Sequence, residues 1–281
     1  MQKSGKNSGG CSSELDGLYR LYELSTSHMT FTILGSGTHF PDPAKRSAGY
    51  LFQNGKDLAL FDFGYGTLLR LAEFKVRYQD IGHIFFTHLH EDHYLDFLPF
   101  LNTLYLQVAS WGLSRRTLRL YGPRGFKKKL EGILDAVGFS YAPHVKLIFQ
   151  ELTRSRIKAS NTVIMSHPVH HADSISALCY RIQGRKGDLA YTGDLDYDEK
   201  IIPFLKGVKT LVIECGFPEL MKRSGHLIPS EAGALAEQAC ARQVILTHRY
   251  PPCDTENIMA QCRREYRGKI IVARDGLALI G

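Results

Sequence analysis

Thr87-His88-Leu89-His90-Glu91-Asp92-His93 is the stretch of the sequence that decides the fold. It follows an apolar run at residues 84–86, which we expect to be a buried strand. His88 and His90 are two positions apart, so their rings project to the same side of an extended segment. Asp92 and His93 come next and, after a turn, can face a second point nearby. Imidazoles and a carboxylate at this spacing predict a site for zinc, manganese or iron.

Outside this stretch, the sequence alternates between strand-like and helix-like segments. We expect strands at 30–34, 58–62, 83–87, 118–121, 189–191, 210–213, 244–246 and 269–273, and helices at 67–74, 94–109, 230–240 and 254–266. Ser230 is the expected N-cap of the third helix, and Asp254 that of the fourth. This pattern predicts an α/β fold in which helices cover sheet layers. Residues 1–28 are expected to form a flexible N-terminal extension before a domain at 29–281.

Composition narrows the class of protein. The chain has 281 residues, of which 44% are hydrophobic and 22% charged, and this is ordinary for a soluble globular protein. It has no apolar run approaching the ~18 residues of a membrane span, and residues 1–13 lack the apolar core of a secretion signal. We therefore expect a cytoplasmic protein without membrane association. The net charge of +7 favours anionic partners, and the six cysteines form no C-x-x-C pair.

The first motif, His88-x-His90-x-Asp92-His93, resembles the H-x-H-x-D-H signature of the metallo-β-lactamase superfamily. Further family motifs follow in order: residues 166–171, Tyr191-Thr192-Gly193-Asp194 and Leu246-Thr247-His248. The resemblance covers about residues 30–281. It implies the αββα sandwich of that family, in which two mixed sheets are covered by helices on their outer faces.

The resemblance also implies a ligand set for two divalent metal ions. One ion would be held by His88, His90 and His171, the other by Asp92, His93 and His248, and Asp194 would bridge them. Such a pair can share a hydroxide and lower its pKa toward neutrality, so a metal-activated hydroxide would be the nucleophile. Zinc is the first expectation for both ions, with Mn²⁺ or Fe²⁺ as alternatives. His170 competes with His171 for its position.

Gly225-His226-Leu227 resembles the G-H-L segment of the phosphodiesterase-like branches of the superfamily. It implies that His226 donates a proton to the leaving oxygen or binds a phosphate, oriented by Glu214. Asp92, His226 and Glu214 are thus the expected catalytic residues. The alternative that His226 merely caps or packs locally stays open. The histidines at 28, 39, 83 and 144 have no partner spacing, so we expect ordinary surface or core positions. Asp196 is expected to be a solvated loop residue.

Asp194 stands where the antibiotic-hydrolysing branch has a sulfur ligand, and His90 where the diiron branch has a carboxylate. Both differences favour a dinuclear hydrolase, either a phosphodiesterase or a ribonuclease Z-like nuclease. Only 23 positions separate His171 from Asp194, which leaves no room for the substrate-gripping arm of ribonuclease Z. Ile213 and Asp96 also replace the histidine and glycine of that branch. We therefore do not expect this chain to bind transfer RNA in the way that ribonuclease Z does.

Several other functions remain open, because one fold hosts many substrates. The main alternative is a hydrolase of a small-molecule ester, thioester, lactone or cyclic phosphodiester. A metal-binding scaffold without activity and a nucleic-acid-binding module are weaker hypotheses. The expected partner is accordingly a phosphoester, RNA or a small-molecule ester, and a homodimer is the expected assembly.

Overall fold

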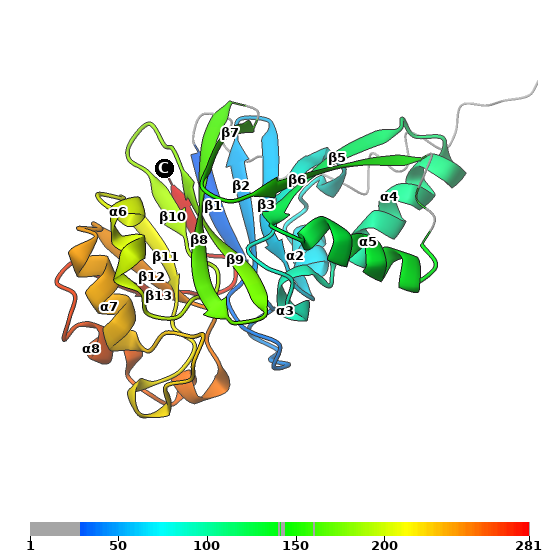
Figure 1. The fold of residues 1–281 in the computed structure, drawn as a ribbon. Helices are drawn as coiled ribbons and strands as arrows, with labels where there is room; N and C mark the ends of the chain where they lie inside the picture. Colours follow the sequence, from blue (N-terminus) through cyan, green and yellow to red (C-terminus); the bar gives the residue numbers. More distant parts are fainter. Residues whose placement is uncertain (1–28, 140, 142–143, 160, 281) are drawn as a thin grey trace, which may run out of the picture.

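A computed structural model describes residues 29–139, 141, 144–159 and 161–280 (Figure 1). The expectation for residues 1–28 lies outside the described residues. The first sheet has the strand order β14-β1-β2-β3-β4-β5-β6, and the second has the order β13-β12-β11-β10-β9-β8-β7. The strands of the first sheet are β1 (Met29–Gly35), β2 (Gly49–Asn54), β3 (Asp57–Phe63), β4 (Ile81–Phe85), β5 (Arg116–Pro123), β6 (Val145–Leu152) and β14 (Ala278–Ile280).

The second sheet has β7 (Ser155–Ala159), β8 (Thr162–Ala172), β9 (Ile175–Ile182), β10 (Leu189–Tyr191), β11 (Thr210–Glu214), β12 (Gln243–Thr247) and β13 (Lys269–Val272). The α-helices are α2 (Thr67–Glu73), α3 (Glu91–Tyr94), α4 (Phe97–Trp111), α5 (Phe126–Ala136), α6 (Ile202–Leu205), α7 (Pro229–Gln238) and α8 (Ile258–Cys262). Short 3₁₀ turns lie at Tyr78–Asp80, Glu199–Ile201, Glu219–Met221 and Pro251–Asp254.

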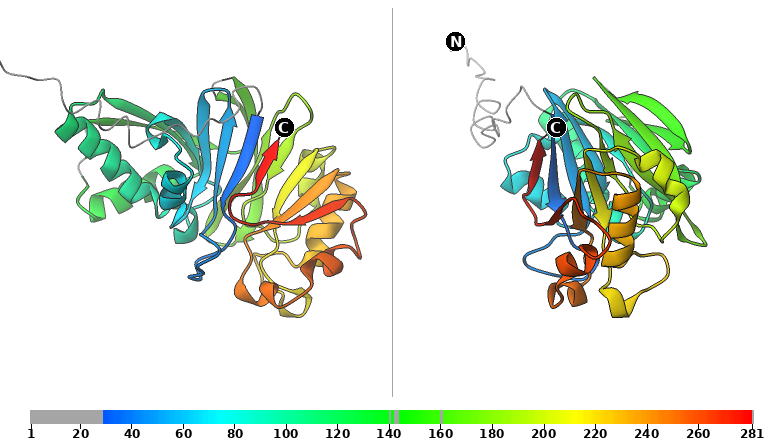
Figure 2. Two further views of the ribbon diagram at one scale, coloured as in Figure 1. Left: turned by 180° about the vertical axis from the view of Figure 1, so that it is seen from behind. Right: turned by 90° about the vertical axis from the view of Figure 1, so that its left-hand side faces the viewer.

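Side-chain alternation along the strands builds three apolar layers. In β3, Ala59 and Phe61 point between the two sheets, where they meet Tyr180 and Tyr191 of the second sheet. The alternate residues of β3 pack with α2, α4 and α5 on the outer face of the first sheet. Helices α6, α7 and α8 cover the outer face of the second sheet (Figure 2). The predicted αββα sandwich is therefore confirmed.

The direction of the strands brings three of the expected metal ligands to the carboxyl ends of parallel strands. Strands β3 to β6 run parallel in the first sheet, and β10 to β13 run parallel in the second. His88 follows the carboxyl end of β4, Asp194 that of β10 and His248 that of β12. In open parallel sheets, ligands bind outside the carboxyl ends of the strands. Among the described residues, no helix is long and apolar enough to cross a membrane.

Two predicted helix boundaries are wrong. Helix α7 begins at Pro229, so Ser230 lies inside it; Glu231 instead accepts a hydrogen bond from the backbone N–H of Ile228 at 3.1 Å. The helix predicted from Asp254 through Tyr266 is limited to α8. Its N-cap is Asn257, which accepts from the N–H of Ala260 at 3.0 Å. Local hydrogen bonds, rather than the wider apolar spacing, set both starts.

Asp62, at the end of β3, joins the two sheets to the loop that follows β4. Its fully buried carboxylate accepts hydrogen bonds from the N–H and hydroxyl of Thr87, at 2.7 and 2.8 Å, and from the Tyr191 hydroxyl of β10 at 2.6 Å. It also lies 2.8 Å from Nδ1 of His93. Asp62 has a φ of 56°, a left-handed value that asparagine and aspartate tolerate best.

We expect Asp62→Asn to lower the free energy of unfolding by about 2–4 kcal/mol, because the amide brings an N–H₂ group against donors and leaves buried groups unpaired. Asparagine keeps the left-handed backbone, so the change isolates the carboxylate. Urea unfolding of the metal-free protein measures the effect. Asp57→Asn, at the partly buried start of β3, is the control and should change the free energy of unfolding by less than about 0.5 kcal/mol, because asparagine keeps an oxygen that can accept from Asn161. Equal midpoints for the two variants would contradict this role.

Candidate metal centre

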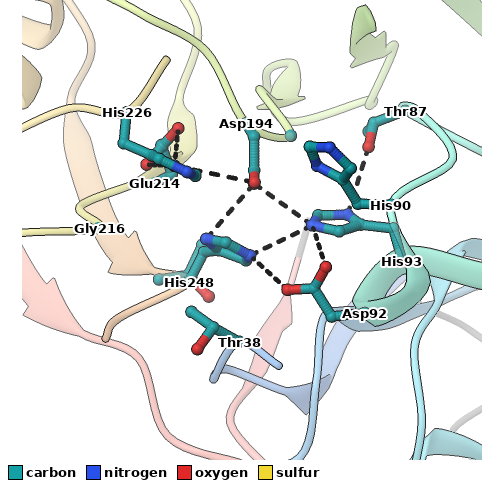
Figure 3. A network of polar contacts seen from close by, with 12 residues as sticks. Thr38, Thr87, His90, Asp92, His93, Asp194, Glu214, Gly216, His226 and His248 are labelled. Carbon is teal, nitrogen blue, oxygen red and sulfur yellow. Dashed lines mark hydrogen bonds and ion pairs between the residues drawn. The ribbon is translucent and has the colours of Figure 1, made fainter. Parts of the chain in front are cut away.

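The seven side chains expected to bind metal converge at the shared edge of the two sheets. His88 lies in the extended segment after β4, and His90 precedes the first turn of α3, which carries Asp92 and His93. His171 comes from β8, whereas Asp194 and His248 follow β10 and β12. Figure 3 shows Asp194 between the ring of His93 and that of His248. Each sheet thus contributes to the cluster.

The first group contains His88, His90, His171 and Asp194, whose ligand atoms all lie within 4.8 Å of one another. Nδ1 of His90 is 3.0 Å from Nε2 of His88 and 3.1 Å from Nε2 of His171. Oδ2 of Asp194 is 3.9 Å from Nε2 of His88. Three ring nitrogens and one carboxylate oxygen therefore face a common point.

The second group contains Asp92, His93 and His248. Nε2 of His248 is 3.2 Å from Nε2 of His93 and 3.3 Å from Oδ2 of Asp92. Oδ1 of Asp194 lies 3.4 Å from His93 Nε2 and 3.4 Å from His248 Nδ1, so this carboxylate faces both groups. The geometry gives Asp194 the position that a bridging ligand needs.

Two atoms of this cluster lack a hydrogen bond. Oδ1 of Asp194 and Nδ1 of His248 are buried and have no hydrogen-bond partner among the described residues. Leaving a buried polar atom unpaired costs about 1–3 kcal/mol, and a bound cation removes that cost. A set of five imidazoles and two carboxylates also suits first-row divalent cations. The residues present therefore fit divalent metal ions.

The pKa shifts of the clustered side chains also favour the binding of a cation. Burial opposes ionisation of Asp194, but the neighbouring His248 and His93 hold its pKa well below the usual value. Burial depresses the pKa of His88 and His171, which keeps these imidazoles neutral and ready to bind metal. Burial also opposes charge on His93, yet Asp194 and Asp62 raise its pKa well above the ordinary value. The carboxylates thus attract positive charge to the centre.

Hydrogen bonds at the far side of two rings fix their orientation. Nδ1 of His171 donates to the carbonyl of Gly225 at 2.7 Å, which leaves Nε2 for a cation. Nδ1 of His93 faces Asp62, so its Nε2 also points into the cluster. Such outer partners select the tautomer of a ligating histidine.

A bulge in β8 decides which of two adjacent histidines points inward. Residues 162, 164 and 166 are buried, but the pairing with β9 shifts between Val169 and Ala172, after which the odd position His171 is buried. An extra residue in one strand reverses the alternation of its side chains. His170 is exposed and lies 3.4 Å from Asp173. The structure thus places His171, and not His170, with the other six residues.

His226 and Glu214 form a pair beside the cluster. Nδ1 of His226 lies 3.1 Å from Oε2 of the buried Glu214, whose other oxygen accepts from the N–H of Leu195 at 2.7 Å. The same nitrogen is 3.8 Å from Oδ2 of Asp194. Burial lowers the pKa of His226, but the Glu214 carboxylate more than offsets this and raises it to about 9. His226 is therefore positively charged near neutral pH and can donate a proton.

Asp196 differs from the expected solvated loop residue. Its carboxylate accepts from the N–H of Gly225 at 2.8 Å and from Nζ of Lys222 at 2.7 Å. Its own N–H donates to the carbonyl of His170 at 2.7 Å. Asp196 therefore connects the loops that carry His171, Asp194 and His226.

His39 also lies at this edge, although the sequence analysis treated it as ordinary. Its Nδ1 is 3.9 Å from Oδ2 of Asp92, and its side chain is 45% exposed. Its ring contacts Phe40 and Tyr250, with centroids 4.8 and 5.3 Å away. The one available signal was its position in the glycine-containing loop that follows the first strand, since loops after strand ends often carry binding residues.

Comparison with known proteins agrees with this architecture. The sequence profile of the family described as "Beta-lactamase superfamily domain" matches residues 59–249. The probable metallo-hydrolase YhfI of Bacillus subtilis is 26% identical over 256 residues, covering 90% of this chain and 100% of that protein. Its crystal structure superposes with a TM-score of 0.78.

Two ribonuclease Z proteins are also similar. The enzyme of Pyrococcus furiosus is 25% identical over 268 residues, covering 78% of this chain and 85% of that protein. The crystal structure of the short form of human tRNase Z has a TM-score of 0.71 at 19% identity, covering 89% of this chain and 98% of that one. The second likeness shows a shared fold.

We expect His171→Ala to lower the metal content by about one ion per chain, because it removes one of four converging ligands. His170→Ala is the matched control: this exposed neighbour should leave the content unchanged. Elemental analysis of the purified variants measures both. Loss of metal from His170→Ala with full retention by His171→Ala would reverse the assignment of these two residues.

Proposed function

We propose, since this chain belongs to the β-lactamase superfamily, that it is a dinuclear phosphodiesterase or ribonuclease Z-like nuclease. The names of the relatives, a probable metallo-hydrolase and ribonuclease Z, support the broader activity, which is metal-dependent hydrolysis of an ester bond. The observation that carries the finer proposal is the position of Asp194, which faces both ligand groups and also the His226–Glu214 pair. This arrangement supports the proposal of two cation sites with a proton donor beside them.

Two divalent cations would be held by His88, His90, His171, Asp92, His93, His248 and the shared Asp194. Zinc is the first choice, and manganese or iron would suit the same ligands. Bound there, the cations supply the positive charge that polarises a phosphoryl group and lowers the pKa of water. Asp92 and Asp194 are anionic without them, because their pKa values lie below the usual range.

His226 performs the proton chemistry of the proposed reaction. Glu214 faces its Nδ1, so Nε2 is the atom that can donate to the leaving oxygen or to a phosphoryl oxygen. A cationic imidazole suits an anionic phosphodiester better than a neutral lactone or thioester, because the charges attract each other. The net charge of +7 favours the same substrate class.

The segment between His171 and Asp194 is short, which supports a catalytic centre without the substrate-gripping arm of ribonuclease Z. Between His171 and Asp194 the chain forms only β9, β10 and short connections. The proposed substrate is therefore a phosphodiester that reaches the centre without such an arm, either a small molecule or the end of an RNA strand.

The test is hydrolysis by the metal-loaded protein of bis(p-nitrophenyl) phosphate, compared with a thioester and a lactone. We expect turnover of the phosphodiester at a rate at least about 100-fold above the other two, and its loss after a chelator removes the cations. Faster hydrolysis of the thioester or the lactone would sink the phosphodiesterase proposal in favour of that bond.

We expect His226→Ala to lower kcat for a dinucleotide, whose alkoxide leaving group needs a proton, by about 10²–10⁴-fold, the usual contribution of a positioned acid. Metal content should stay unchanged. Glu214→Gln keeps a partner for the ring but removes its charge, so we expect a smaller decrease. His226 also lies with Asp194 and His248 in a group that could hold a cation. Loss of metal from His226→Ala would make it a ligand and disprove the proton-donor role.

A further inference from the structure

Four rings line one side of the metal centre: His39, Phe40, Phe217 and Tyr250, here called the aromatic rim. The ring of Phe217 stacks on Tyr250 with centroids 4.4 Å apart and planes at 17°. Phe40 meets the same tyrosine at 5.7 Å with planes at 71°, so the two rings form a corner. Phe40 is 47% exposed, which leaves much of its surface uncovered by the described residues.

The aromatic rim borders the reacting groups directly. The centroid of Tyr250 is 5.5 Å from that of His226 and 5.9 Å from that of His248. Phe217 is 5.7 Å from His226. A phosphoryl group within reach of His226 would therefore lie next to two rings of the aromatic rim.

The backbone that carries Phe40 is held firmly. The hydroxyl of Ser47 donates to the carbonyl of Thr38 at 2.8 Å, and the N–H of Gly37 donates to that of Arg46 at 2.8 Å. Lys45 forms an ion pair with Asp254, in the 3₁₀ turn that directly follows Tyr250. These contacts connect the loop that carries Phe40 to the turn that follows Tyr250, so a ligand has less of this backbone to order when it binds.

We propose that the aromatic rim is a stacking subsite for a planar base attached to the scissile phosphate. This inference rests on the proposed phosphodiesterase function and narrows its substrate to nucleoside phosphodiesters. Stacking on aromatic side chains accepts any base, because every base has a π face. The base can belong to a free nucleotide or to the end of an RNA strand.

The experiment compares two substrates with the same p-nitrophenolate leaving group: thymidine 5′-(p-nitrophenyl phosphate) and methyl p-nitrophenyl phosphate. For the metal-loaded Phe40→Ala variant we expect KM for the thymidine substrate to rise about 10-fold more than KM for the methyl substrate. Phe40→Trp keeps a ring and should restore wild-type discrimination. Trp111→Ala is the control: its ring is 56% exposed at the end of α4, away from the centre, so neither KM should change.

The two proposals fail in different ways. If the wild-type protein hydrolyses neither substrate, the phosphodiesterase function is wrong. If it hydrolyses both and Phe40→Ala changes the two KM values equally, the function stands and the stacking subsite is overturned. Competitive inhibition by thymidine 5′-monophosphate and by a short single-stranded oligoribonucleotide identifies the source of the base. Weaker inhibition of Phe40→Ala by either compound supports the subsite, and unchanged inhibition by both contradicts it.

Discussion

The buried carboxylate of Asp62 is the constraint on which the rest of the site depends. A charge removed from water is expensive unless donors surround it, and here Thr87, His93 and Tyr191 do so. These donors come from the loop after β4, from helix α3 and from β10 of the second sheet, whereas Asp62 itself lies at the end of β3 of the first sheet. The carboxylate therefore fixes the separation of the sheets and the orientation of one expected ligand at the same time. Packing alone, which is non-directional, would fix neither to the same degree.

Close backbone contacts support the same arrangement. At Gly193 a side chain would come within 2.6 Å of Thr87, and its φ of 59° is left-handed. At Gly225 a side chain would come within 2.3 Å of the carbonyl of His171, with a φ of 85°. Glycine is the residue that tolerates both the conformation and the approach. The glycines that precede Asp194 and His226 in sequence therefore allow their loops to reach the centre.

The part of the site that the sequence predicts well is the part encoded locally. His88, His90, Asp92 and His93 lie within six positions of one another, so a strand end followed by one turn nearly determines where they point. The choice between His170 and His171 depends on a bulge in β8, which arises from pairing with β9 and leaves no periodic signal. Strands β6, β7 and β8 escaped prediction for a related reason. Their half-buried, polar faces lack the apolar runs of β3 and β11.

His39 and Phe40 show the same limit for loops. They lie beside Tyr250 in a loop that is joined to the following turn by an ion pair between Lys45 and Asp254, 209 positions apart, which no local pattern encodes. Each candidate ligand group, by contrast, takes side chains from both sheets. Cations bound there would hold the sheets together and stabilise the folded state in proportion to their affinity. The centre therefore has little freedom to change, whereas the loop at 36–46 and the segment at 217–224 can vary around it. Under the proposed function, these loops would set substrate choice and the fixed edge of the sheets would carry out bond cleavage.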